Sequence, residues 1–364
     1  MRVTFPHMGY MWICLKAMLE HLGIETVVPP PSTKKTLDLG SKYSPEFACM
    51  PFKLNLGNFM EASEIGADTI IMAGGCGPCR FGYYAQVEYE ILTELGYQYD
   101  LVVMEPPEKN VGELIAKIKH ISGNRPLLEV IRAIRHGYRK ARAVDELEKM
   151  AAWARPRELE PGKTEEVLAG VLERVAAADG AEELEKTVES CRAEMRSIPV
   201  ENRPVLKVGL VGEIYTLLEP FANFDIEKKL GSLGIEVNRS IYLSEWVNDH
   251  LFMGLVKGLR SSKVYIKAAG PYLKHFVGGH GQETLGSAVY YNENGYDGII
   301  QLLPFTCMPE IVAQSILPVF SSDTGMPVMT LIVDEQSGEA GFMTRLEAFV
   351  DLLAERKGKR RELA

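Results

Sequence analysis

The sequence predicts an α/β protein in which two open parallel-sheet domains flank a helical segment. In the first third of the chain, short apolar runs alternate with helical patterns, and the same alternation resumes at Pro204. Between about Gly112 and Ile198, alanine, glutamate, lysine, arginine and leucine dominate. Short, fully apolar strands separated by helices are typical of parallel sheets. We therefore expect α/β domains at residues 1–111 and 201–364, with a helical insert at 112–200.

The first domain is expected to contain four strands, each a short apolar run that ends at a loop. We predict strands at residues 1–6, 23–28, 68–72 and 101–104, and helices at 10–22, 51–65 and 84–95. Pro51 suits the first position of its helix, because its missing N–H would have no partner there. Residues 29–33 and the pair Gly74-Gly75 are expected to form loops.

The insert is expected to be helical, and the second domain repeats the strand–helix alternation. Pro126 can start a long helix toward Trp153, and Asp179-Gly180 separates two further helices, at 163–178 and 181–195. We interpret the insert as a scaffold that joins the two halves, with a substrate lid as the alternative. In the second domain we predict strands at 205–210, 235–237, 298–303 and 327–333, and helices at 219–230, 309–317 and 344–355, with another helix ending within 290–295.

The composition is globular and argues against two classes of protein. Hydrophobic residues make up 46% of the 364 residues, and the net charge is −9. This acidic balance argues against a nucleic-acid binder, which needs a basic face. No apolar run approaches about 18 residues, so no membrane span is expected. Without a signal-peptide pattern, we expect a cytoplasmic protein. In that reducing compartment, the six cysteines are expected to be metal ligands or redox thiols rather than disulfides.

Two Cys-Met-Pro units mark the candidate site, at Cys49-Met50-Pro51 and Cys307-Met308-Pro309. Each proline is expected to open a helix, so each cysteine lies just ahead of a helix N-terminus. The partial positive charge there lowers the pKa of a thiol and favours the thiolate, which is the form that binds iron or zinc. By contrast, Cys14 is interpreted as a core residue on an apolar helix face, and Cys191 as a free thiol of the insert.

The run Cys76-Gly77-Pro78-Cys79 has two interpretations, a thioredoxin-like dithiol and a metal site. We favour the metal, because a dithiol oxidoreductase needs no further cysteines at helix starts. Zinc commonly takes a second pair of cysteines or nearby histidines, whereas ligation by dispersed thiols suits an iron–sulfur cluster. Cys49, Cys76, Cys79 and Cys307 could hold a 4Fe–4S cluster together. Three of them could also hold it and leave one iron open, in which case Cys79 is the expected spare ligand.

The candidate residues are expected at the carboxyl ends of strands, where open α/β sheets form their sites. Cys76 follows the strand at 68–72 and Cys307 the strand at 298–303, so two facing domains could share one site. Glu213 ends the first strand of the second half and could handle protons, bind a partner or cap the next helix. His280 lies in a glycine-rich loop that could approach a ligand closely.

Several of these runs resemble those of a known family. They are Cys49-Met50-Pro51-Phe52-Lys53, Gly75 to Tyr84, Gly212-Glu213-Ile214-Tyr215, and Gly295 to Pro309. The chain resembles the 2-hydroxyacyl-CoA dehydratase component family, and most closely its short members, the acyl-CoA dehydratase activase-related proteins. The resemblance implies two flavodoxin-like domains around an iron–sulfur cluster. It also implies an ATP-hydrolysing iron–sulfur activator as partner and, in dehydratases, a second subunit.

Three hypotheses about function follow. The chain could be an iron–sulfur reductase or dehydratase, or a component of one, with a 4Fe–4S or larger cluster. It could instead be a non-catalytic carrier or scaffold for a cluster. The third hypothesis is a dithiol oxidoreductase that uses Cys76 and Cys79. A P-loop is missing from the sequence, so any use of ATP would belong to the partner.

Overall fold

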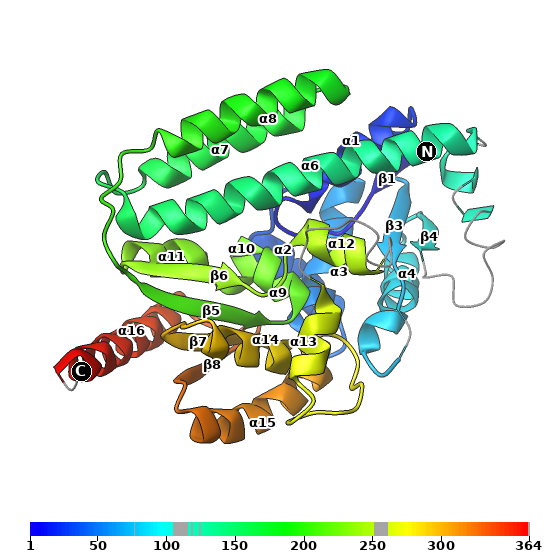
Figure 1. Cartoon of the computed structure of the whole chain (residues 1–364). Helices are drawn as coiled ribbons and strands as arrows, with labels where there is room; N and C mark the ends of the chain where they lie inside the picture. The colour runs from blue at the N-terminus through cyan, green and yellow to red at the C-terminus, as the bar shows by residue number, and fades with distance from the viewer. Residues whose placement is uncertain (76, 105–115, 118, 124, 251–260, 363–364) are drawn as a thin grey trace. The chain divides into compact units, whose positions relative to one another are not determined.

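The structure is a computed structural model, and it describes all residues except 76, 105–115, 118, 124, 251–260 and 363–364 (Figure 1). The chain forms two compact units, Met1–Arg142 and Ala143–Ala364, which are described separately. The division between them falls inside the long helix α6 (Leu127–Ala154). The boundaries that the sequence suggested for its three segments stay predictions.

The first unit contains a four-stranded sheet in which every pairing is parallel. Its strands are β1 (Arg2–Thr4), β2 (Glu25–Thr26), β3 (Thr69–Ala73) and β4 (Asp100–Met104), in the order β2-β1-β3-β4. Its helices before α6 include α1 (Met11–His21), α2 (Lys34–Tyr43), α3 (Met50–Glu64) and α4 (Tyr84–Glu94), with the short η1 (Arg80–Tyr83) before α4. All four predicted strands and the three predicted helices are confirmed.

Helix α2 was not predicted from the sequence, and two features of its neighbourhood explain why it forms. A capping box at its start joins Thr33 and Thr36, each side chain accepting from the other residue's backbone N–H. Its packing against α3 depends on glycines. A Cβ at Gly40 would lie 1.6 Å from the carbonyl oxygen of Lys53, and one at Gly57 would lie 2.0 Å from that of Thr36. The two helix backbones therefore touch directly.

The predicted helices of the insert are present. After α6 come η2 (Arg155–Arg157), α7 (Lys163–Ala177) and α8 (Ala181–Arg196), and Figure 1 shows α7 and α8 as an antiparallel pair. Cys191 is fully buried in α8, where its thiol donates to the carbonyl oxygen of Val171 at 3.6 Å. This cysteine therefore packs between the two helices of the pair.

The second unit contains a sheet of the same design. Its strands are β5 (Leu206–Gly212), β6 (Ile235–Arg239), β7 (Gly298–Pro304) and β8 (Val328–Val333), all parallel, in the order β6-β5-β7-β8. Its further helices are α9 (Ile214–Leu218), α10 (Pro220–Asn223), α11 (Ile226–Ser232), α12 (Leu243–His250), α13 (Ser262–Ala268), α14 (Gly281–Glu293), α15 (Met308–Thr324) and α16 (Glu339–Glu362).

The single helix predicted at 219–230 is wrong, because this stretch contains two short helices, α10 and α11. Phe224 and Asp225 both adopt the left-handed region, with φ of 55° and 54°, which ends one helix before the next begins. The helices α12 and α13 were also not predicted. Their sequences are short, and burial against neighbours decides their structure more than periodicity does.

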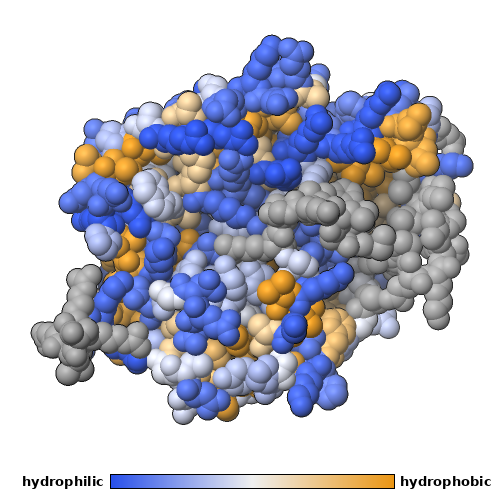
Figure 2. Space-filling model, viewed as in Figure 1, coloured by the Kyte–Doolittle hydropathy of each residue, from blue (hydrophilic) through white to orange (hydrophobic). Residues whose placement is uncertain are grey.

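The predicted fold class is confirmed: two four-stranded, all-parallel sheets with many helices. In each unit the first strand lies between the second and third, as in doubly wound flavodoxin-like sheets. None of the described helices is long and apolar enough to cross a membrane. The face drawn in Figure 2 is mostly hydrophilic, with limited hydrophobic patches between the polar side chains.

Candidate functional site

The strand order of the second unit defines a place where a ligand site is expected. In doubly wound sheets, sites form beyond the carboxyl ends of the two central strands, where the chain leaves in opposite directions. The central strands here are β5 and β7. Glu213 follows β5 directly and Cys307 follows β7 after two residues. The sequence therefore placed both candidates correctly with respect to their strands.

Cys307 is the N-cap residue of α15, and Pro309 lies in the first turn. Its backbone N–H donates to the carbonyl oxygen of Pro304 at 2.9 Å, and its own carbonyl accepts from Ile311 at 2.9 Å. Thr306 turns the chain before it with a left-handed φ of 67°. The side chain is buried, with 7% of the residue exposed. The thiol thus lies at the positive end of a 17-residue helix, as predicted.

Glu213 caps the next helix, α9. Its carboxylate oxygens accept from the backbone N–H groups of Tyr215 at 2.9 Å and Thr216 at 3.0 Å. Burial raises the pKa of the Glu213 carboxyl, although these two N–H donors oppose the shift. The capping role is therefore present, while a role in proton transfer stays a prediction.

A buried carboxyl that sequence reasoning missed lies in the first turn of the Cys307 helix. Glu310 is fully buried and accepts from the Thr284 hydroxyl at 3.0 Å and from the Gln301 amide at 2.9 Å. Burial raises the pKa of Glu310 to about 7, against the effect of both hydrogen bonds. Its position three residues after Cys307 was the available sequence signal. Thr284 belongs to α14, so this carboxyl joins α14 to α15.

His280 is the N-cap residue of α14, which lies against the start of α15. A Cβ at Gly281 would lie 2.6 Å from the carbonyl oxygen of Pro309, so the two helix starts are in close contact. The His280 Nε2 lies 3.8 Å from a carboxyl oxygen of Glu283, which sequence reasoning also missed. Burial lowers the pKa of His280 to about 3, and His250 acts in the same direction. Within this unit, Glu213, His280 and Cys307 thus all stand at helix starts.

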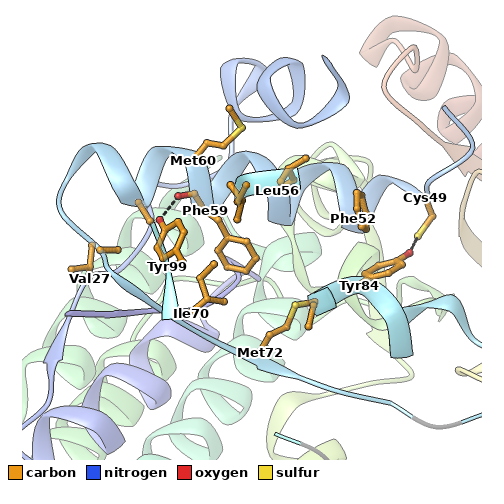
Figure 3. Close-up of a cluster of buried hydrophobic side chains, with 14 residues drawn as sticks. Val27, Cys49, Phe52, Leu56, Phe59, Met60, Ile70, Met72, Tyr84 and Tyr99 are labelled. Atoms are coloured by element: carbon orange, nitrogen blue, oxygen red, sulfur yellow. Dashed lines mark hydrogen bonds between the residues drawn. The ribbon is translucent and has the colours of Figure 1, made fainter. Parts of the chain in front are cut away.

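The second Cys-Met-Pro unit has the same local geometry within the first unit. Cys49 is the N-cap residue of α3, with Pro51 in the first turn, and 8% of the residue is exposed. Its Sγ and the Tyr84 hydroxyl form a short hydrogen bond, visible in Figure 3. The ring of Tyr84 also packs edge-on against Phe52, with centroids 5.0 Å apart. Tyr84 was not given a role by sequence reasoning, although it ends the run that begins at Gly75.

The predicted Cys-Gly-Pro-Cys pair is described only in part. Cys76 lies outside the described residues. Cys79 is partly buried and precedes η1, with its carbonyl accepting from the backbone N–H of Gly82 at 3.3 Å. Cys14 of α1 is partly buried and donates to the carbonyl of Met11 at 2.9 Å.

The residues present fit thiolate ligation chemically, although the described residues do not form a complete site. Cys49 and Cys307 are cysteines at helix N-caps, where the thiolate is favoured. Among the described side chains, no group of three or more His, Cys, Asp or Glu is arranged to hold a metal ion. A ligand set that includes Cys76 extends outside the described residues.

Comparison with known proteins identifies one segment of the chain. Residues 7–72 match the model of a family described as the CoA enzyme activase uncharacterised domain. This range runs from the loop before α1 to β3 and contains Cys49. No curated protein matches the chain.

Proposed function

We propose that this chain is an iron–sulfur protein of the 2-hydroxyacyl-CoA dehydratase type. In this proposal it accepts a low-potential electron from an ATP-hydrolysing iron–sulfur activator. It then reduces or dehydrates a small or CoA-linked substrate, alone or with a second dehydratase-like subunit or a second copy of itself. The match of residues 7–72 to a CoA enzyme activase domain supports the family relation in its coarser form.

One observation carries the proposal. Both Cys-Met-Pro units place a buried cysteine at the N-cap of a long helix, with a proline in the first turn. A buried, uncharged thiol that only fills space is not stabilised by a position at a helix N-terminus. A thiolate ligand gains from it, because the unsatisfied N–H groups of the first turn stabilise negative charge. The repetition of the arrangement in both units argues for a shared chemical purpose.

The residues that would hold a 4Fe–4S cluster are Cys49, Cys307, Cys79 and Cys76. Such a cluster supplies single-electron transfer when bound. The remaining candidates are Glu213 and His280. Glu213 holds the start of α9, and His280 is a neutral imidazole beside a carboxyl. In that state His280 can accept a hydrogen bond from a substrate placed against it, because a pKa of about 3 makes it a weak base.

Anaerobic purification tests the proposal directly. Iron and sulfide content and an EPR signal after reduction are expected in the wild type. Cys49→Ala and Cys307→Ala are expected to lose most of the iron, whereas Cys191→Ala, which removes a thiol between α7 and α8, retains it. An iron-free, colourless protein with a reducible Cys76–Cys79 disulfide would instead support the dithiol oxidoreductase. Reduction of the iron centre that requires both activator and ATP would distinguish the enzyme or its subunit from a passive carrier.

A further inference from the structure

A small cavity in the second unit lies at the carboxyl end of β6, between α12, α13 and α14. Its free volume is about 30 Å³, against the roughly 10–15 Å³ that a single water needs. It therefore has room for the head group of a ligand. The polar residues in its lining include Glu245, Asp249, His250, His280, Glu283 and Ser287.

The charges around the cavity disfavour an anion. Three lining residues are carboxylic acids, and none of the described lining residues is lysine or arginine. Lys149 lies nearby, but its Nζ is paired with Glu245 at 2.6 Å. An acyl-CoA phosphate or a free carboxylate would meet no described cation in this lining. A neutral or positively charged ligand fits better.

Two buried polar atoms in the lining have no hydrogen-bond partner among the residues that the structure describes. The Oγ of Ser287 is one, and only 1% of that residue is exposed. The second is Oδ1 of Asp249, whose other oxygen accepts from the backbone N–H of Ser262. Buried polar groups in folded proteins are normally paired, so each such atom indicates a missing partner. Both atoms can accept a hydrogen bond. The carboxylate oxygen of Asp249 can only accept, so its missing partner must be a donor.

Aromatic rings complete the cavity. Trp246, Tyr242 and Tyr265 line it, and the Trp246 ring is stacked on the His250 ring with centroids 4.6 Å apart. Aromatic faces attract cations, and Lys149 already lies 4.1 Å from the centre of the Tyr242 ring. Among the described residues, no group of three or more His, Cys, Asp or Glu side chains could hold a metal ion. A cation bound by hydrogen bonds therefore fits this cavity better than a metal ion does.

We propose that this cavity binds the ammonium group of a small primary amine, or free ammonium, through Asp249, Ser287 and the His280–Glu283 pair. An ammonium group offers only donors, and the two unpartnered atoms are acceptors. The neutral imidazole of His280 supplies a further acceptor. The proposal does not rest on the iron–sulfur function, because none of its residues is a proposed cluster ligand. His280 is the one residue that both proposals use.

Binding is expected to release a proton from Glu283. Burial raises the pKa of Glu283 to about 8, with Asp249 and Glu310 acting in the same direction, so its carboxyl is mostly protonated at pH 7. When the ammonium enters, the O–H bond of Glu283 breaks, its proton passes to the buffer, and the carboxylate faces the new positive charge. The net charge of the cavity is unchanged. Among the described residues, the titratable groups around Glu283 come from its own helix and from three neighbouring helices. They are His280 at the start of α14, Glu245, Asp249 and His250 of α12, Tyr265 of α13 and Glu310 of α15.

Calorimetric titration of the wild-type chain at pH 7, in phosphate and in MOPS, tests the proposal. These buffers differ in ionisation enthalpy, so a difference in heat measures the protons released. Ammonium and methylammonium chloride are expected to bind, with release of up to about one proton. If only ammonium binds, the ligand is free ammonium. If ammonium and methylammonium both bind, the ligand is a primary amine. Potassium chloride and tetramethylammonium chloride, which offer no N–H donors, are expected not to bind.

Variants locate the site. Asp249→Asn is expected to weaken binding roughly tenfold or more, because a charge-assisted hydrogen bond is lost. Ser287→Ala is expected to weaken binding without lowering the melting temperature of the empty protein, since its hydroxyl has no partner there. Glu283→Gln keeps the shape of the protonated acid and is expected to abolish proton release. Glu293→Gln, an exposed acid at the other end of α14, is the matched control and is expected to behave as wild type.

Three results would overturn the proposal. If neither ammonium nor methylammonium gives binding heat to the wild type, the cavity holds water only. Equal binding of potassium would show that hydrogen-bond donors are not recognised. Unchanged binding in the folded Asp249→Asn and Ser287→Ala variants would place the ammonium elsewhere. The first two results use the wild-type protein, so they stand even where a variant fails to fold.

Discussion

The Cys49 thiol and the Tyr84 hydroxyl form a hydrogen bond that joins the start of α3 to the start of α4 within the first unit (Figure 3). Both residues are buried and belong to the same hydrophobic cluster. A hydroxyl that donates to the sulfur stabilises its negative charge. Tyr84 is therefore a positioning residue for a thiol that we propose as a cluster ligand.

Replacing Tyr84 by phenylalanine removes this hydrogen bond but keeps the ring packing, so it isolates the contribution of the bond to stability. Tyr84→Phe is expected to lower the free energy of unfolding by about 0.5–1.5 kcal/mol, the usual net value of a hydrogen bond. Urea unfolding of the iron-free, reduced protein measures it. Tyr83→Phe is the matched control, because Tyr83 is 75% exposed. Equal losses in the two variants would show that the bond to Cys49 adds nothing to stability.

Contact between α2 and α3 is expected to depend on glycine. A Cβ at Gly57 would lie 2.0 Å from the Thr36 carbonyl oxygen. Gly57→Ala should therefore force the helices apart and destabilise the protein by about 1–3 kcal/mol, the typical cost of overpacking. In α7, a Cβ at Gly170 would meet nothing within 4 Å. Gly170→Ala is accordingly expected to stabilise the protein by about 0.5–1 kcal/mol. Denaturant unfolding of both variants is the measurement, and a stable Gly57→Ala protein would contradict the close contact.

These two regions also show what could and could not be predicted from the sequence. The helix starts at both Cys-Met-Pro units were predicted correctly, because the preference of proline for the first turn of a helix is a local effect. Helix α2 was missed, since it depends on Gly40 meeting the backbone of the next helix, α3, and such a packing contact leaves no periodic pattern in the sequence. The strands of both sheets were predicted from apolar runs.

The cavity residues escaped prediction for a related reason. Asp249, Glu283 and Ser287 belong to two helices separated by more than twenty residues of sequence, and only tertiary packing brings them to one place. His280 was singled out because glycines surround it, and Glu283 three residues later was the available signal of a pair. Helix periodicity gives no information about which polar side chains will face each other.

The stability of the protein is expected to fall with rising pH in the range where Glu283 ionises. The folded pKa of Glu283 is raised to about 8 from an ordinary value of 4.5, so the folded state binds more protons than the unfolded state between these values. The contribution of Glu283 is therefore full below about pH 4.5 and is lost as the pH rises to about 8.

The effect of His280 on the pH dependence of stability is opposite to that of Glu283. Its pKa is lowered to about 3 from 6.5, so its contribution is full above about pH 6.5 and is lost as the pH falls toward 3. Measurement between pH 6.5 and 8 therefore separates the two groups. Glu283→Gln, followed by melting temperature across that range, is expected to reduce the slope, whereas Glu293→Gln leaves it unchanged. An identical slope in wild type and Glu283→Gln would show that this carboxyl is not buried in its protonated form.

Removal of iron is expected to destabilise the folded chain if the proposed cluster is bound. A metal centre that binds the folded state and not the unfolded state adds its binding free energy to stability. Treatment of the anaerobically purified protein with a chelator should therefore lower its melting temperature. Cys49→Ala and Cys307→Ala should already melt at the lower temperature and respond little to the chelator, while Cys191→Ala should respond as wild type does. A melting curve that the chelator leaves unchanged, in a protein shown to have lost its iron, would count against a structural role for these two thiols. Loss of stability in Cys49→Ala alone would restrict the iron centre to the first unit.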